Sequence, residues 1–175
     1  FITVIINEGL GSPGTVWDYT GTLTPSASGA SQIYIGGDFT SVAGTPRARI
    51  ARLLATGALD GSFAPVSGPD NTVFTLLPSA SSVLIGGAFT SFNSVPRAGI
   101  AQLNVDGSLD TTFDIGTGAN AIVYAVGVQA NDKIIVVGDF SAIGGTPRGR
   151  IARLNADGSI DTSFDPGSGA NATVY

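Results

Sequence analysis

Apolar residues recur along this chain in short runs, separated by clusters of Gly, Pro, Ser, Asn and Asp. Small or polar residues alternate with large apolar ones over 123–129, VYAVGVQ, which predicts a β-strand. The next run, KIIVVG at 133–138, is apolar on both faces, which predicts a strand enclosed between stacked sheets. Two more strands are predicted at 150–155 and 159–165, joined by the hairpin dipeptide Asp157-Gly158. No segment shows sustained helical periodicity, so the sequence predicts an all-β fold.

One sequence motif occurs three times along the chain. The stretch 35–53, IGGDFTSVAGTPRARIARL, returns as IGGAFTSFNSVPRAGIAQL at 85–103 and as VVGDFSAIGGTPRGRIARL at 136–154. Four positions recur in every unit, and we interpret them as structural. They are Gly37, Gly87 and Gly138; Arg47, Arg97 and Arg148; Asp60, Asp110 and Asp161; and Phe63, Phe113 and Phe164.

Four strands in a unit of about fifty residues are typical of one blade of a β-propeller. We divide the chain into a partial N-terminal repeat (outer strand and linker, 1–15), three repeats (16–72, 73–122 and 123–173) and the start of a further repeat (174–175). In this division Val16-Trp17 opens the first repeat, and the aliphatic start FITVII supplies the fourth strand of a preceding blade. Because closed propellers have about four to eight blades, three units predict part of a larger propeller. We favour a segment of a longer array over a ring completed by several identical copies.

These motifs resemble a known repeat family. The stretch VGDFSAIGGTPRGRIARLNADGSIDTSFDPGSGAN is similar to the delta-60 repeat, and the likeness extends over about residues 14–175. The first unit departs from it at LLATGALDGSFAPVSGPDN, which lacks the Asn-x-Asp-Gly turn. The resemblance implies β-propeller repeats of large secreted or surface proteins of bacteria and of phage structural proteins, without an assigned activity.

Composition narrows the function classes. Charged residues make up only 12% of the chain and the formal net charge is −5, with seven arginines and a single lysine, so no basic stripe is available for nucleic acid. The apolar runs are too short to cross a bilayer, so we expect no membrane insertion. The chain contains no Cys, His or Met, which excludes thiolate nucleophiles, imidazole bases and the usual zinc or copper ligands. We expect no cofactor and no enzymatic activity; a hydrolase built on a carboxylate pair such as Asp157 and Asp161 is the weakest alternative.

The Asn-x-Asp-Gly turns carry the only candidate metal ligands. Oxygen-bearing side chains at alternate positions resemble the opening of a calcium loop, but the downstream bidentate Glu is absent. The other interpretation is a turn in which these side chains bind local backbone groups. The weak calcium candidates are Asn104, Asp106, Asp110, Asn155, Asp157 and Asp161.

Arginines provide the second set of candidates. Arg47, Arg97 and Arg148 each precede the recurrent aspartate by thirteen residues, and we expect an Arg–carboxylate pair within each unit, with a ring of ligand contacts as the alternative. A second set of arginines is less uniform, because the middle unit has Gly99 and Gln102 at these positions. Two interpretations are left for this set: specific recognition of a ligand, or neutral variation of surface residues. Its arginines are Arg49, Arg52, Arg150 and Arg153.

Aromatic residues occupy one repeated slot at a strand start, namely Trp17, Phe74, Tyr124 and Tyr175. Packing between units and sugar binding both remain open for them. We therefore expect a structural or adhesive module of a larger extracellular, cell-surface or virion protein, with a lectin-like propeller as the alternative. The expected partners are other repeats of the same chain or identical subunits, and a glycan or protein at a cell surface.

Overall fold

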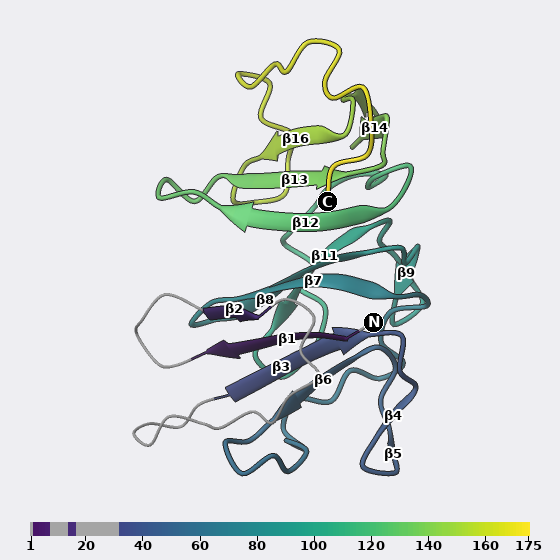
Figure 1. Ribbon diagram of the computed structural model, residues 1–175, viewed down its shortest axis with the longest axis vertical. Coiled ribbons are helices and arrows are strands. Elements are labelled where there is room, and N and C mark those ends of the chain that lie inside the picture. Colours follow the sequence, from purple (N-terminus) through teal and green to yellow (C-terminus); the bar gives the residue numbers. More distant parts are fainter. Residues whose placement is uncertain (1, 8–13, 17–31) are drawn as a thin grey trace.

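The computed structural model describes residues 2–7, 14–16 and 32–175, and every regular element among them is a β-strand. Three antiparallel sheets follow one another along the chain and lie in a stack (Figure 1). The first has the order β2-β1-β3-β6, the second β11-β8-β7 and the third β12-β13-β16. The all-β prediction and the threefold repetition are confirmed.

The strands of the three sheets keep the spacing of the repeats. The first sheet comprises β1 (Ile2–Asn7), β2 (Gly14–Val16), β3 (Gln32–Gly37) and β6 (Ile50–Leu53). The second comprises β7 (Val73–Pro78), β8 (Ser82–Gly87) and β11 (Ile100–Asn104). The third comprises β12 (Val123–Val128), β13 (Ile134–Gly138) and β16 (Ile151–Leu154).

A two-stranded hairpin follows the middle strand of each sheet, along one side of the stack (Figure 1). The three hairpins are β4 (Ser41–Val42) with β5 (Thr45–Pro46), β9 (Ser91–Phe92) with β10 (Val95–Pro96), and β14 (Ala142–Ile143) with β15 (Thr146–Pro147). The stretch between the second and third predicted strands of each unit therefore contains a short ladder of its own.

The fourth strand of each unit is reduced to one bridge. The predicted strand at 159–165 pairs only through Leu154↔Ile160, and the other two repeats have the equivalent bridges Leu53↔Leu59 and Leu103↔Leu109. Directly after each bridge the recurrent aspartate accepts a hydrogen bond from the backbone N–H two residues further on, as Asp161 does from Ser163. This local turn competes with ladder pairing, so the chain bends away from the sheet.

The N-terminal segment pairs differently from the prediction. Ile2 of β1 is registered with Gly37, just as Val73 is with Gly87 and Val123 with Gly138. Strand β1 thus takes the slot assigned to Val16-Trp17, and that assignment is wrong. Strand β2, which includes Val16, pairs with the other edge of β1; Trp17 lies outside the described residues. A strand with two open edges can pair with a neighbour at each edge. The pattern of apolar residues in the sequence does not show which neighbours these are.

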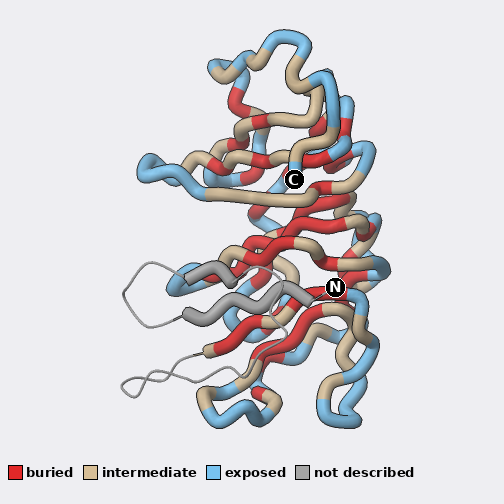
Figure 2. Tube along the Cα trace, viewed as in Figure 1, coloured by how far each residue is buried: buried red, intermediate tan, exposed pale blue. Residues whose placement is uncertain are grey.

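Two buried clusters hold the stack together (Figure 2). One lies between the first and second sheets and includes Tyr34, Phe63 and Ile85; the other lies between the second and third and includes Leu84 and Val136. Each sheet buries its faces against its neighbours, which explains why the middle strands are apolar on both faces.

The recurrent glycine ends the middle strand where two backbones approach closely. A Cβ atom on Gly87 would lie 2.2 Å from the Thr72 carbonyl oxygen, and one on Gly138 would lie 2.1 Å from that of Ile122. No side chain fits at these two positions, because a Cβ atom would overlap the backbone of the connection that precedes the sheet.

Candidate functional site

The most buried polar group in the described part of the chain is an arginine–aspartate lock in the first repeat. Arg52 Nε donates to Asp60 Oδ2 at 2.7 Å, and Arg52 Nη2 donates to Ser62 Oγ at 2.8 Å. The guanidinium lies over the rings of Tyr34 and Phe63, at 5.7 and 5.3 Å from their centroids. Its Nη1 crosses to the second repeat, where it donates to the Val105 carbonyl oxygen at 2.6 Å. This arginine therefore joins two sheets.

The expected pairing of Arg47, Arg97 and Arg148 with the recurrent aspartates is wrong. Each of these arginines donates through Nη1 to the carbonyl oxygen of the proline just before it, at 2.9 Å. The aspartate partner lies eight residues away because the chain folds back directly after the third strand, which brings Arg52 opposite Asp60. Arginines that the sequence singled out as variable are thus the structural ones.

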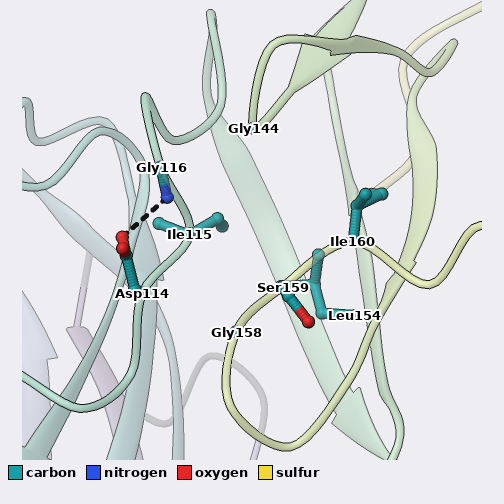
Figure 3. A pocket seen from close by; sticks show the side chains of 8 residues that line it. All are labelled: Asp114, Ile115, Gly116, Gly144, Leu154, Gly158, Ser159 and Ile160. Atoms are coloured by element: carbon teal, nitrogen blue, oxygen red, sulfur yellow. Dashed lines mark hydrogen bonds between the residues drawn. The ribbon is translucent and has the colours of Figure 1, made fainter.

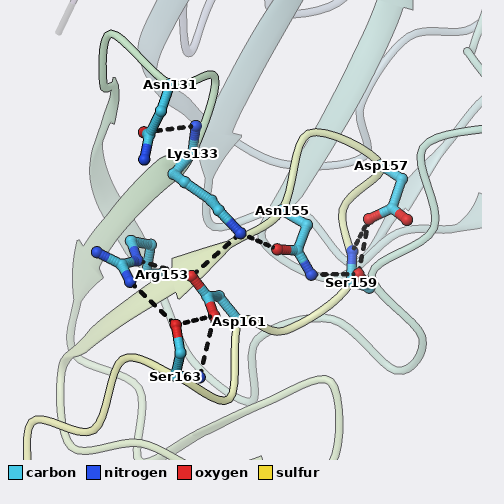
Figure 4. A network of polar contacts seen from close by, with 8 residues as sticks. All are labelled: Asn131, Lys133, Arg153, Asn155, Asp157, Ser159, Asp161 and Ser163. Carbon is cyan, nitrogen blue, oxygen red and sulfur yellow. Dashed lines mark hydrogen bonds and ion pairs between the residues drawn. The ribbon is translucent and has the colours of Figure 1, made fainter.

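The lock changes from repeat to repeat. In the second repeat Gln102 Nε2 donates to Asp110 Oδ2 at 3.0 Å in place of an arginine. In the third, Asp161 Oδ2 pairs with both Arg153 Nε, at 2.8 Å, and Lys133 Nζ, at 3.3 Å (Figure 4). The Ser163 hydroxyl is the first cause that lowers the pKa of Asp161, and the two cations lower it further. The Asp161 carboxylate stays charged well into the acid range.

The pKa values of the other two recurrent aspartates are also lowered. Burial by itself raises the pKa of Asp60, but the hydrogen bonds from Ser62 and Arg52 outweigh that effect. For Asp110 the Thr112 hydroxyl is the first cause of the lowered pKa. Each carboxylate accepts several donors within its own repeat, as a structural anion does.

One carboxylate oxygen of Asp106 and one of Asp157 accept hydrogen bonds within their own turns. Asp106 Oδ1 accepts from the backbone N–H and the hydroxyl of Ser108, while Asn104 Nδ2 donates to the same hydroxyl. Asp157, Ser159 and Asn155 repeat this arrangement, and Lys133 Nζ also contacts Asn155 Oδ1 (Figure 4). Over residues 2–7, 14–16 and 32–175, three or more acidic side chains nowhere gather as a metal site. This geometry favours the interpretation as a hydrogen-bonded turn.

The same turns dock on the preceding repeat. The Ala64 N–H donates to the Asp106 carbonyl oxygen at 2.9 Å, and the Asp114 N–H donates to that of Asp157 at 2.8 Å. Gly107 has φ +86°, and a Cβ there would lie 2.9 Å from Pro65 Cδ. The turn therefore both closes its own hairpin and connects adjacent sheets.

The remaining variable arginines brace the connections between repeats. Arg49 and Arg150 adopt left-handed backbone conformations, where the middle repeat has Gly99. Arg49 Nε lies 3.7 Å from Asp38 Oδ1 and its Nη1 donates to the Pro69 carbonyl oxygen at 3.2 Å. Arg150 repeats both contacts, with Asp139 at 3.6 Å and the Ala170 carbonyl oxygen at 3.0 Å.

Three of the repeated aromatic residues form a row across the stack. The ring centroids of Phe74 and Tyr124 lie 5.3 Å apart, and those of Tyr124 and Tyr175 lie 4.9 Å apart. A β-bulge interrupts the ladder at Phe74 and again at Tyr124, and such bulges redirect a side chain. Packing between repeats is thus observed, while Tyr175 remains 80% exposed at the end of the row.

Two hollows lie between the second and third repeats. The larger, about 360 Å³, is lined by Leu77, Ser82, Leu84 and Gln102 of the second sheet and by Val128 and Ile134 of the third; we call it the 2–3 cleft. The smaller, about 200 Å³, lies between Ile115 and the Leu154–Ile160 turn (Figure 3). One oxygen of its carboxylate, on Asp114, accepts the Gly116 N–H within its own turn at 2.9 Å.

Comparison with known families agrees with the repeated geometry. A family model described as a domain of unknown function (DUF5122) beta-propeller matches residues 32–63, 82–113 and 129–164, which together make up more than half of the chain. The chain belongs to this β-propeller family. No curated protein and no solved structure matches it. Among the residues that the structure describes, no helix is long and apolar enough to cross a membrane.

Proposed function

We propose that the chain is a non-enzymatic structural and adhesive module of a larger extracellular or cell-surface protein, or of a virion protein such as a phage tail fibre. Its sheets act as a rigid scaffold that presents loops. The observation that carries the proposal is that polar groups connect adjacent repeats. Arg52 reaches the Val105 carbonyl oxygen, and the Asp106 and Asp157 turns dock on the repeat before them.

The hairpins are braced in the same manner. Asp70 Oδ1 accepts the N–H groups of Thr90 and Ser91 at 2.7 and 3.1 Å, which fixes the second hairpin to the connection that precedes it. Asn120 holds the third hairpin through Ser141 and Ala142 in the same way. Such repeated bracing suits a scaffold, because it fixes loops that need not be alike in sequence.

Loop insertion tests the scaffold role. A short epitope inserted between Ala130 and Asn131, in the exposed β12–β13 turn, should leave the melting temperature within a few degrees and remain accessible to its antibody. The matched control is the same insertion between Gly107 and Ser108, which should unfold the protein because that turn docks on Pro65. Equal loss of stability at both sites would contradict a scaffold that presents loops.

A carbohydrate-binding propeller is the second candidate, and the aromatic row favours it. Phe74 and Tyr124 are partly exposed and Tyr175 is largely exposed, and aromatic faces of this kind stack on sugar rings. A glycan array probed at high protein concentration tests the idea. Binding that is lost in Tyr124→Ala and kept in Tyr124→Phe would support it, and an array without hits would refute it.

We also propose that these repeats are of the delta-60 type, on the strength of the quoted motif. In that case the partners are other repeats of the same chain or identical subunits, together with a glycan or protein of a cell surface. The size of the intact particle, measured by light scattering, tests self-association; a strictly monomeric particle without further repeats would count against it.

A further inference from the structure

The first and second repeats differ at one row of residues that faces the next sheet. In the first sheet Tyr34 is registered with Arg52, and in the second Leu84 is registered with both Leu77 and Gln102. The repeat offset of fifty residues makes Leu84 the counterpart of Tyr34 and Gln102 the counterpart of Arg52. Both side chains are therefore shorter in the second repeat.

In the first repeat this row holds a phenol ring. The Tyr34 side chain is 1% exposed, and its ring packs edge-on against Phe63 with the centroids 5.5 Å apart. Its hydroxyl donates to Gln32 Oε1 and accepts from Arg52 Nη1, each at 3.3 Å. The space between the first and second sheets thus accommodates an aromatic ring with a hydroxyl at a polar rim.

In the second repeat the counterparts of all three residues line the 2–3 cleft. Leu84 stands where the ring was, Ser82 is the counterpart of Gln32, and Gln102 is the counterpart of Arg52. Val128 and Ile134 of the third sheet supply the opposite apolar wall. The cleft keeps polar groups where the phenol hydroxyl would lie, and it keeps apolar walls where the ring would lie.

We propose that the 2–3 cleft binds a phenolic ring. The ring lies between Leu84 and Ile134, and the hydroxyl exchanges hydrogen bonds with Ser82 and with the amide of Gln102. At about 360 Å³ the cleft lies near the lower end of the volumes of small-ligand pockets, about 300–1,000 Å³. This inference is independent of the scaffold role, because it concerns a difference between repeats and not their common features.

Titration with p-cresol, the isolated side chain of tyrosine, tests the proposal on the full chain. Calorimetry or chemical shifts of the Leu84 and Ile134 methyl groups should show one saturable site, with affinity about fivefold higher than for toluene, which lacks the hydroxyl. N-acetyltyrosinamide separates the sources of the ring: binding equal to that of p-cresol indicates a tyrosyl chain, and binding of p-cresol alone indicates a free small phenol. Failure of both phenols to bind would overturn the proposal.

Filling the cleft provides the decisive control. The double variant Leu84→Tyr with Gln102→Arg restores the residues of the first repeat and should reduce p-cresol affinity more than tenfold. In case that variant fails to fold, Val128→Trp blocks the cleft from its rim, since Val128 is half-exposed and tolerates a larger side chain. Unchanged p-cresol affinity in a folded variant of either kind would place binding elsewhere and overturn the proposal.

Discussion

Arg52 Nε lies 2.7 Å from Asp60 Oδ2, and both side chains are almost fully buried between the first and second sheets. The same guanidinium also reaches Ser62, Tyr34 and the Val105 carbonyl oxygen. A buried carboxylate that loses such a partner retains its desolvation cost, so this pair is a sensitive point of the fold.

Arg52→Gln copies the residue that the middle repeat uses at this position. We expect it to lower the free energy of unfolding by about 1–3 kcal/mol, because the contacts to Ser62 and Val105 are lost. Urea titration measures the change. Arg97→Ala is the matched control: its guanidinium donates to the carbonyl oxygen of Pro96, the residue just before it, in an exposed hydrogen bond, so a change within about 0.5 kcal/mol is expected. Equal effects of the two substitutions would contradict the reassigned pair.

Gly87→Ala should be severely destabilising, by about 3 kcal/mol or more, because the added methyl group would meet the Thr72 carbonyl oxygen at 2.2 Å. That oxygen also accepts the Ala88 N–H, so it cannot easily move. Gly127→Ala is the control, since nothing lies within 4 Å of a Cβ there. Thermal unfolding of the two variants should differ widely, and similar melting temperatures would refute the close approach.

Tyr124 contacts rings on both sides, so Tyr124→Ala should cost about 1–3 kcal/mol, the sum of two aromatic contacts. Tyr124→Phe keeps both rings and should be nearly neutral. Chemical denaturation measures both, and a double-mutant cycle with Phe74→Ala isolates the pair. A coupling energy near zero in that cycle would show that the row adds nothing to stability.

Acid should weaken the second hairpin through Asp70. Burial raises the pKa of this carboxyl, but hydrogen bonds from Thr90 and Ser91 lower it more, to about 2. A carboxyl with a depressed pKa stabilises the fold fully above its ordinary pKa of 3.8, and this contribution is lost as the pH falls toward about 2.

Asp70→Asn tests this dependence, because Asn120 holds the third hairpin without a charge. The variant should show a shallower fall in melting temperature between about pH 5 and pH 2 than the parent chain. At neutral pH we expect a cost below about 1 kcal/mol, since the side chain is exposed. An identical pH profile would exclude Asp70 as a contributor to acid sensitivity.

Calcium should not stabilise the protein. The carboxylates of Asp106 and Asp157 already accept hydrogen bonds from Ser108 and Ser159. We therefore expect the melting temperature to be the same in millimolar calcium and in chelator, whereas an ion bound only to the folded state would raise it. A rise that is lost in Asp157→Asn would establish a calcium site in the third repeat.

The sequence by itself determined the all-β fold, the offset of the repeats and the recurrence of a glycine at one position of each unit. These features depend on local periodicity and on residue type, such as a glycine that has no side chain, and both can be read directly from the sequence. The tertiary structure decided which residues and which strands pair within the chain. Arg52 and not Arg47 reaches Asp60, β1 takes the slot assigned to Val16-Trp17, and the fourth strand shortens to a bridge. These pairings depend on where the chain reverses direction after each strand. The spacing of residues in the sequence does not determine that point. The 2–3 cleft was also decided by the tertiary structure. Nothing in the sequence marks Leu84 and Gln102 as lining residues. The stacking of the sheets places them at the positions that Tyr34 and Arg52 occupy in the first repeat.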